Sequence, residues 1–155
     1  DLRACVLKRP RHDHIVKDLN KMNVKINYIT DGDIAGVLSV IGNNPRNDIY
    51  YSTGGGPEGV LAAAALSCFG GQIQGRLVLN EDEKIRAKKL GIQDFKKKYN
   101  IDDMIKGDVI FCASGVTTGD LTKGVQDLGN EFEVTTFALH KSKNINKTIT
   151  NIYNK

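Results

Sequence analysis

The residues best suited to chemistry lie in four short loops, each of which follows a segment with the pattern of a strand. These loops are residues 9–12 (RPRH), 31–33 (DGD), 54–59 (GGGPEG) and 114–120 (SGVTTGD). Together they supply guanidinium groups, carboxylates, hydroxyls and exposed backbone N–H groups. In α/β sheets, ligands bind at the carboxyl ends of the strands. We therefore expect a ligand site to be built from these loops.

The first loop has the residue types that bind phosphate. Arg9 and Arg11 flank Pro10, and a guanidinium presents a rigid fork of donors that fits a phosphate at two points. Pro10 restricts the backbone between them. The alternative is a pair of solvated arginines before a helix, and the residues alone leave both interpretations open. His12 and His14 are expected to begin that helix rather than to act as ligands.

Carboxylates dominate the second and third loops. Asp31 and Asp33 flank Gly32, where they can bind a metal, accept hydrogen bonds from sugar hydroxyls, or cap the following helix. Glu58 follows three glycines and offers a hard oxygen ligand of the kind that Mg²⁺ and Mn²⁺ prefer. A carboxylate at a helix start also complements the helix dipole. The third loop matches neither a Walker A sequence nor a GxGxxG fingerprint, and the role of the fourth stays open.

Apolar periodicity predicts the elements that must position these loops. We expect strands at 4–7, 24–29, 48–52, 73–79, 108–113 and 132–139, and helices at 14–22, 34–41, 60–69 and 80–90. Repeated strand, loop and helix predict an α/β layered fold with a mixed or mostly parallel sheet. The 155 residues suit one domain or part of a larger one. We expect an α/β domain over 1–140 and a polar, basic tail over 141–155.

Composition argues against several classes of protein. The net charge of +4 comes from the tail, because residues 1–140 carry equal numbers of basic and acidic side chains. With 6% aromatics and no Trp, nucleic-acid binding is disfavoured. No apolar run reaches the roughly 18 residues of a membrane span, so no membrane partner is expected. Cys5, Cys68 and Cys112 lie far apart in apolar runs, which favours free thiols and a cytoplasmic location.

The four loops, in this order, resemble the class II fructose-1,6-bisphosphatase family, some members of which also act on sedoheptulose 1,7-bisphosphate. The segments that carry the resemblance are Lys8–His12 (KRPRH), Asp31–Gly36 (DGDIAG), Gly54–Leu77 (GGGPEGVLAAAALSCFGGQIQGRL) and Ile110–Val125 (IFCASGVTTGDLTKGV). The resemblance implies a fold similar to that of the lithium-sensitive sugar and inositol phosphatases. It also implies hydrolysis of the 1-phosphate of fructose 1,6-bisphosphate to fructose 6-phosphate in gluconeogenesis, with Mn²⁺ or Mg²⁺.

The resemblance also implies roles for individual residues, carried over by position. The phosphate-binding stretch matches Arg9, Pro10 and Arg11, the substrate-contacting positions match Asp31, Gly32, Asp33 and Gly55, and one metal ligand matches Glu58. In the last loop, Ser114 stands where the family usually has Thr, and Thr118 stands where it usually has Asp.

The family's other metal-binding carboxylates lie in its amino-terminal half. The chain is therefore expected to be the carboxy-terminal half of such an enzyme, with no catalytic residue of its own. Its expected partners are the missing amino-terminal half and further copies of itself in a homo-oligomer. Because Glu58 alone cannot assemble a two-metal site, we expect these 155 residues to be inactive by themselves.

Three alternatives compete with this interpretation. The first is a non-catalytic sugar-phosphate-binding or regulatory fragment, which would bind phosphate esters without a metal. The second is an assembly role, in which an exposed apolar face drives association. The third is a nucleotide-binding enzyme, which the missing fingerprints disfavour.

Overall fold

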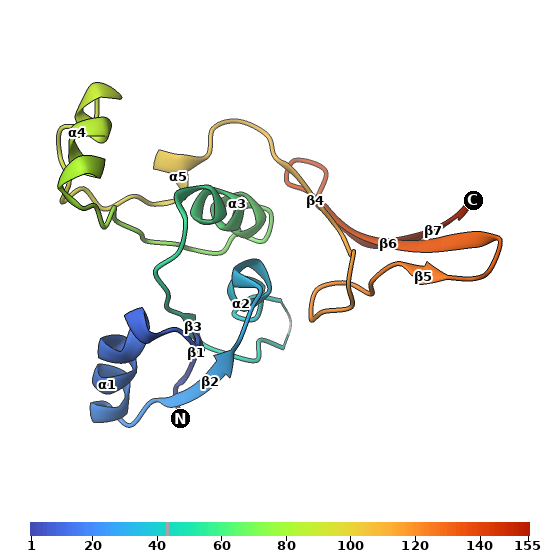
Figure 1. Ribbon diagram of the computed structural model, residues 1–155, viewed down its shortest axis with the longest axis horizontal. Coiled ribbons are helices and arrows are strands. Elements are labelled where there is room, and N and C mark those ends of the chain that lie inside the picture. The colour runs from blue at the N-terminus through green and yellow to red at the C-terminus, as the bar shows by residue number, and fades with distance from the viewer. Residues whose placement is uncertain (43) are drawn as a thin grey trace.

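The computed structural model describes residues 1–42 and 44–155 and contains two β-sheets with helices beside them (Figure 1). The first sheet is parallel, in the order β2-β1-β3, and consists of β1 (Arg3–Leu7), β2 (Lys25–Ile29) and β3 (Ile49–Tyr50). The second is antiparallel and consists of β4 (Ile110–Ser114), β5 (Gln126–Asp127), β6 (Glu131–His140) and β7 (Ile145–Asn154). The helices are η1 (a 3-10 turn, Pro10–His12), α1 (Asp13–Lys21), α2 (Asp33–Leu38), α3 (Gly56–Ser67), α4 (Glu81–Lys89) and α5 (Ile101–Met104).

Helix α1 covers one face of the parallel sheet. Ala4 and Val6 of β1 point to the same face, because side chains alternate along a strand. They form a buried cluster with Ile15 and Leu19 of α1, which recur at the spacing of one helix face. The helix expected at 14–22 and the strand expected at 4–7 are thus confirmed.

Helices α2 and α3 form a layer between the two sheets. Val37 of α2 is buried against Leu66 of α3, while Ala65 of α3 is buried against Phe111 of β4 and Leu139 of β6. The order of layers is therefore α1, parallel sheet, α2 with α3, and antiparallel sheet, as Figure 1 shows. This arrangement confirms the expected α/β layered class, with parallel and antiparallel pairing separated into two sheets.

Two expected segments differ in the structure. Residues 73–79 form no strand, since their pairing within the described chain is a single antiparallel bridge between Gly75 and Tyr99. The expected tail, 141–155, instead turns back as β7 and pairs with β6 from Ile145 to Asn154. Its Ile and Thr residues favour strands, a signal that the Asn and Lys residues between them obscured. None of the described helices is long and apolar enough to cross a membrane.

Gly36 allows α2 to approach the parallel sheet closely. A Cβ atom at this position would lie 2.6 Å from Tyr50 Cε2 and 2.7 Å from Ile29 Cδ1. We expect Gly36→Ala to lower the free energy of unfolding by about 1–3 kcal/mol through overpacking, measured by denaturant unfolding. The matched control is Gly59→Ala in α3, where a Cβ meets no atom within 4 Å. An equal loss in both variants would contradict this account.

Asp108 ties the start of the antiparallel sheet to the turn between β6 and β7. It accepts hydrogen bonds from Ser142 Oγ at 2.5 Å and Ser142 N at 3.0 Å, and His140 Nε2 lies 2.7 Å away. The bond from the Ser142 hydroxyl, followed by that from His140, holds the pKa of Asp108 well below its usual range. A lowered folded-state pKa contributes stability above the unfolded value, near 4, that is lost as pH falls through the folded value.

We therefore expect the stability difference between the wild type and Asp108→Asn to shrink below about pH 4. Unfolding curves measured from pH 5 down to pH 2 would test this. A difference that stays constant across that range would show that the charge of Asp108 does not stabilise the turn.

Candidate active site

Three of the four loops meet at one edge of the parallel sheet. Strands β1, β2 and β3 run in the same direction, so the loops that begin after Leu7, Ile29 and Tyr50 leave the sheet at the same edge. These loops carry every residue that the sequence assigned to a substrate or metal role.

The arginine loop is anchored to the glycine-rich loop. Arg9 has an extended backbone (φ −143°, ψ 144°) and is followed by Pro10 at the start of η1. Its Nη1 donates to Lys8 O at 2.9 Å. Arg11 is exposed, yet its Nε donates to Thr53 O at 2.7 Å. Arg11 is therefore held against the third loop rather than freely solvated, and this bond leaves its Nη groups for an anion.

The two carboxylates of the DGD loop have different surroundings. Asp31 bonds within the turn itself, and Asp33 is oriented by a neighbouring strand. Gly32 is the N-cap of α2 with φ +83°, a conformation that favours glycine. No side chain caps this helix, so the alternative that an aspartate serves as the cap is wrong. Asp31 Oδ1 instead accepts the N–H of Gly32 at 2.8 Å.

Asp33 is fixed by Tyr50 at the end of β3. The Tyr50 hydroxyl donates to Asp33 Oδ1, and burial, followed by this bond, raises the pKa of Tyr50 above its usual value. The other carboxylate oxygen, Oδ2, faces Gly54, where a Cβ atom would lie 3.3 Å from it. Asp33 thus lies beside the glycine-rich loop, within reach of a ligand that this loop would bind.

Glu58 lies in the first turn of α3, which begins at Gly56 after the N-cap residue Gly55 and has Pro57 as its second residue. The Glu58 side chain folds back over Gly55 so closely that a Cβ there would be 2.1 Å from Oε2. Glu58 is exposed and can give one hard oxygen ligand to a divalent metal. No group of three or more His, Cys, Asp or Glu side chains that could hold a metal occurs among residues 1–42 and 44–155. The described part of the chain therefore does not form a metal site of three or more such side chains by itself.

His12 has a place in the site that its position in the sequence did not predict. It was expected only to begin a helix, but it is buried and its ring bonds to the backbone at the ends of two different loops. The sequence could have pointed to His12 only through its place within the RPRH loop. Its partner Thr53 lies 41 residues away, so no local pattern indicates the bond between them.

The fourth loop does not join the other three. It follows β4 in the antiparallel sheet and folds on itself, with the Gly124 N–H donating to Thr118 Oγ1 at 3.0 Å. Ser114 Oγ pairs with Thr136 Oγ1 at 2.8 Å. Asp120 reaches Arg46 at 3.3 Å, and Arg46 precedes β3, at the opposite end of that strand from Gly54. The structure thus places this loop, whose role the sequence left open, after a strand of the other sheet and against Arg46.

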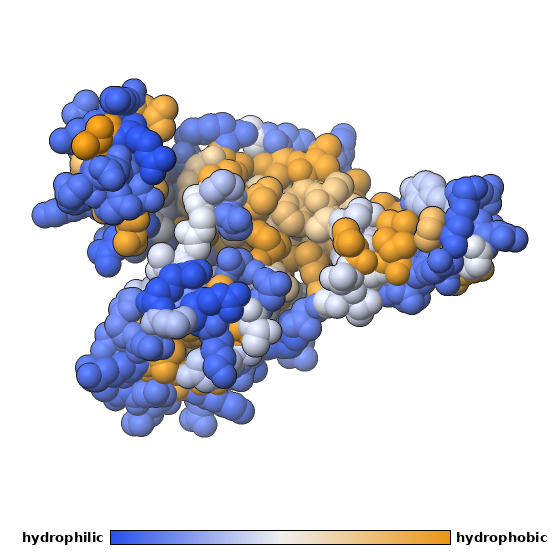
Figure 2. Space-filling model, viewed as in Figure 1, coloured by the Kyte–Doolittle hydropathy of each residue, from blue (hydrophilic) through white to orange (hydrophobic). Residues whose placement is uncertain are grey.

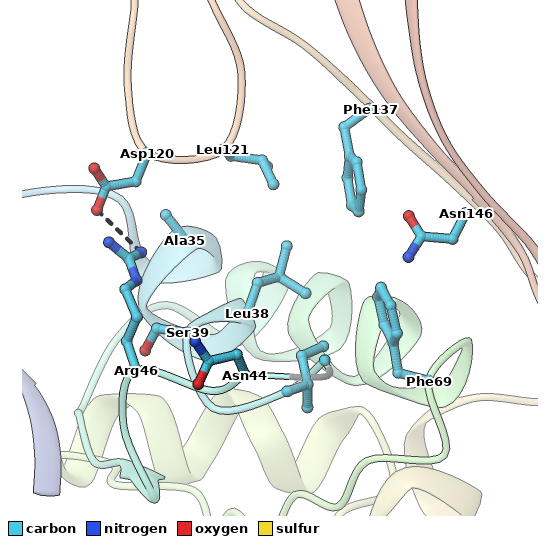
Figure 3. A pocket seen from close by; sticks show the side chains of 12 residues that line it. Ala35, Leu38, Ser39, Asn44, Arg46, Phe69, Asp120, Leu121, Phe137 and Asn146 are labelled. Atoms are coloured by element: carbon cyan, nitrogen blue, oxygen red, sulfur yellow. Dashed lines mark hydrogen bonds and ion pairs between the residues drawn. The ribbon is translucent and has the colours of Figure 1, made fainter.

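A cavity of about 270 Å³ lies between α2, the Arg46–Asp120 pair and β6 (Figure 3). Leu38, Phe69 and Phe137 form its apolar side. None of the residues expected to bind substrate or metal lines it. The candidate site is therefore the open edge formed by the three loops, and not this cavity.

An α/β layered chain with an arginine loop, a glycine-rich loop and an exposed carboxylate at one sheet edge has the form of a phosphate-binding protein. The family described as "Bacterial fructose-1,6-bisphosphatase, glpX-encoded" matches residues 1–153. The chain belongs to this family, which confirms the resemblance seen in the sequence.

Three curated relatives support this assignment. The chain is 35% identical to "Fructose-1,6-bisphosphatase class 2" of Haemophilus influenzae, over 95% of this chain and 49% of that protein. It is 34% identical to "Fructose-1,6-bisphosphatase 2 class 2" of Escherichia coli, over 83% of this chain and 44% of that protein. It is 30% identical to "D-fructose 1,6-bisphosphatase class 2/sedoheptulose 1,7-bisphosphatase" of a Synechococcus strain, over 100% of this chain and 49% of that protein. The chain thus spans about half the length of these relatives.

Proposed function

We propose that this chain is the carboxy-terminal half of a metal-dependent class 2 fructose-1,6-bisphosphatase. The reaction is hydrolysis of the 1-phosphate of fructose 1,6-bisphosphate to fructose 6-phosphate, a step of gluconeogenesis. The observation that carries the proposal is the meeting of Arg11, Asp33 and Glu58 at one sheet edge. Arg11 bonds to Thr53 O, and the Asp33 and Glu58 carboxylates lie where Cβ atoms added to Gly54 and Gly55 would meet them.

In this proposal the arginine loop binds the phosphate group of the substrate that is not hydrolysed. Arg9 and Arg11 give charge-assisted hydrogen bonds to it, and Pro10 sets the turn between them. Asp31 and Asp33 accept hydrogen bonds from sugar hydroxyls, with Gly32 shaping their loop. These contacts hold the reacting ester in place, which is a large part of the rate enhancement in such reactions.

The glycine-rich loop serves the reacting end of the substrate. Gly55 is proposed to contact the substrate through its backbone, and because it has no side chain it leaves room for the Glu58 carboxylate beside it. Glu58 would hold one Mn²⁺ or Mg²⁺, both of which prefer such oxygen ligands. A bound divalent metal would supply an activated water and neutralise charge on the leaving oxygen. The remaining metal ligands come from the amino-terminal half in this proposal.

Exposed apolar surface supports a partner for this chain. Figure 2 shows a broad apolar area near the middle of one face. Separately, large apolar side chains in different segments are exposed: Leu61 of α3 is 50% exposed, Val78 is 70% exposed, and Leu90, directly after α4, is 80% exposed. Exposed apolar surface of this extent is typical of faces that another part of a protein covers. The partners proposed are the amino-terminal half and, beyond it, further copies in a homo-oligomer. The three free cysteines fit the proposed cytoplasmic location.

Phosphate release from fructose 1,6-bisphosphate with Mn²⁺ tests the proposal directly. The chain would be assayed alone and together with an amino-terminal half, supplied in cis or as a co-expressed fragment. We expect only the combination to be active, with sedoheptulose 1,7-bisphosphate assayed in parallel. Turnover by the chain alone would contradict the two-part site. An inert combination whose halves bind each other, with metal-independent binding of phosphate esters, would favour the non-catalytic fragment.

A further inference from the structure

His12 bridges two loops of the candidate site through both of its ring nitrogens. Its side chain is buried, with 1% of its surface exposed. Nδ1 lies 2.6 Å from Leu7 O at the end of β1, and Nε2 lies 2.9 Å from Thr53 N in the loop after β3. The ring thus joins the backbone before the arginine loop to the backbone before Gly54.

The two partners determine which ring nitrogen carries the proton. A carbonyl oxygen can only accept, so Nδ1 must donate its hydrogen to Leu7 O. A backbone amide can only donate, so Nε2 must be unprotonated and accept from Thr53 N. Thr53 O also lies 3.1 Å from Nε2, but the Thr53 amide nitrogen is closer, at 2.9 Å, and a hydrogen on Nε2 would meet the amide hydrogen. The bonded ring is therefore the neutral form with its hydrogen on Nδ1.

We propose that His12 is a positioning residue that holds the arginine loop and the glycine-rich loop at a fixed separation. The inference rests on the proposed function, because those loops are the ones assigned to the substrate phosphate and the metal. His12 follows Arg11 directly, and Thr53 precedes Gly54 directly, so the bond links the two loops at their bases. Since β3 ends at Tyr50, the His12 ring gives the Thr53 amide a partner beyond the strand.

The arrangement differs from that of a histidine that merely fills the core. One of its bonds goes to the backbone of Leu7 at the end of β1, and the other to the backbone of Thr53 in the loop after β3. Arg11 adds a second bond to that loop, to Thr53 O at 2.7 Å. A displacement of about 1 Å between substrate-binding groups can cost around 100-fold in rate. A bond that sets this separation therefore affects substrate binding in addition to stability.

Two conservative variants separate the two bonds of the ring. The amide nitrogen of Asn takes the place of Nδ1, so His12→Asn keeps a donor for Leu7 O but is too short to reach Thr53. The carbonyl oxygen of Gln reaches the place of Nε2, so His12→Gln keeps an acceptor for the Thr53 amide. The control is His14→Asn, because His14 is exposed in the first turn of α1, two residues after His12.

Kinetics of the chain joined to its amino-terminal half, with Mn²⁺, give the first readout. We expect His12→Asn to raise the KM for fructose 1,6-bisphosphate about tenfold, the size of one lost loop-to-loop hydrogen bond. We expect His12→Gln to stay within about threefold of the wild type, and His14→Asn to match it. If both His12 variants lowered the melting temperature and kcat with an unchanged KM, His12 would be a structural residue only and the inference would be overturned.

A second readout does not depend on activity. Nitrogen-15 NMR of the wild type is expected to show the His12 hydrogen on Nδ1, and hydrogen exchange is expected to show a Thr53 amide that is protected in His12→Gln and exposed in His12→Asn. A hydrogen on Nε2, or equal protection in both variants, would overturn the inference. A wild-type protein with these signatures but no phosphatase activity would instead overturn the proposed function and the assigned role of the two loops.

Discussion

Glu58→Gln is expected to lower metal-dependent phosphate release by about 100-fold or more. Removing a residue that only supports a metal ligand already lowers metal affinity or activity by about 10- to 100-fold. Glu58 is proposed as a direct ligand, so its loss should cost at least as much. Glutamine keeps the size and one oxygen but removes the charge that attracts a divalent cation. Because Glu58 is exposed, the melting temperature should change little, with at most about 1 kcal/mol lost from the helix dipole interaction.

The measurement is phosphate release as a function of Mn²⁺ concentration, with the chain joined to its amino-terminal half. Glu81→Gln is a matched control, since Glu81 is an exposed carboxylate in the first turn of α4. It should lose a similar small amount of stability and retain full activity. If Glu58→Gln retained activity and lost only stability, Glu58 would serve the helix and not a metal.

Gly55→Ala is expected to reduce activity by about 10- to 100-fold while leaving the fold nearly intact. Gly55 has φ −69° and ψ 149°, which alanine adopts without strain. The added Cβ would lie 2.1 Å from Glu58 Oε2, so the carboxylate must move away. The substitution thus displaces the proposed metal ligand without removing it, and the loss of the glycine at the N-cap costs only about 1 kcal/mol of stability.

Gly56→Ala is the control for this variant. It adds a methyl group to the next residue, where a Cβ meets no atom within 4 Å. We expect Gly56→Ala to keep near-normal activity, and the free energy of unfolding of both variants to stay within about 1 kcal/mol of the wild type. If the two variants lost activity equally, a general sensitivity of the loop would explain the result, and not the contact between Gly55 and Glu58.

Local signals predicted most of the elements because they depend on neighbouring residues. The spacing of Ile15 and Leu19 predicted α1, and Pro57 after the glycines marked the start of α3. Two segments were misassigned because the local pattern does not show whether a partner strand lies beside them. Residues 73–79 alternate like a strand but pair only at Gly75, whereas residues 145–154, expected as part of a tail, pair along all ten residues of β6.

The candidate site likewise combines features that the local sequence determines with features that only the tertiary structure decides. The sequence by itself determined that Arg11, Asp33 and Glu58 follow strands or begin helices, because turn residues and periodicity are local properties. Only the tertiary structure decided that His12 bonds to Thr53 and Tyr50 to Asp33, pairs 41 and 17 residues apart. These contacts exist because β3 pairs with β1 and brings the loops to one edge. The same packing places Asp120 against Arg46, away from that edge, since β4 belongs to the other sheet.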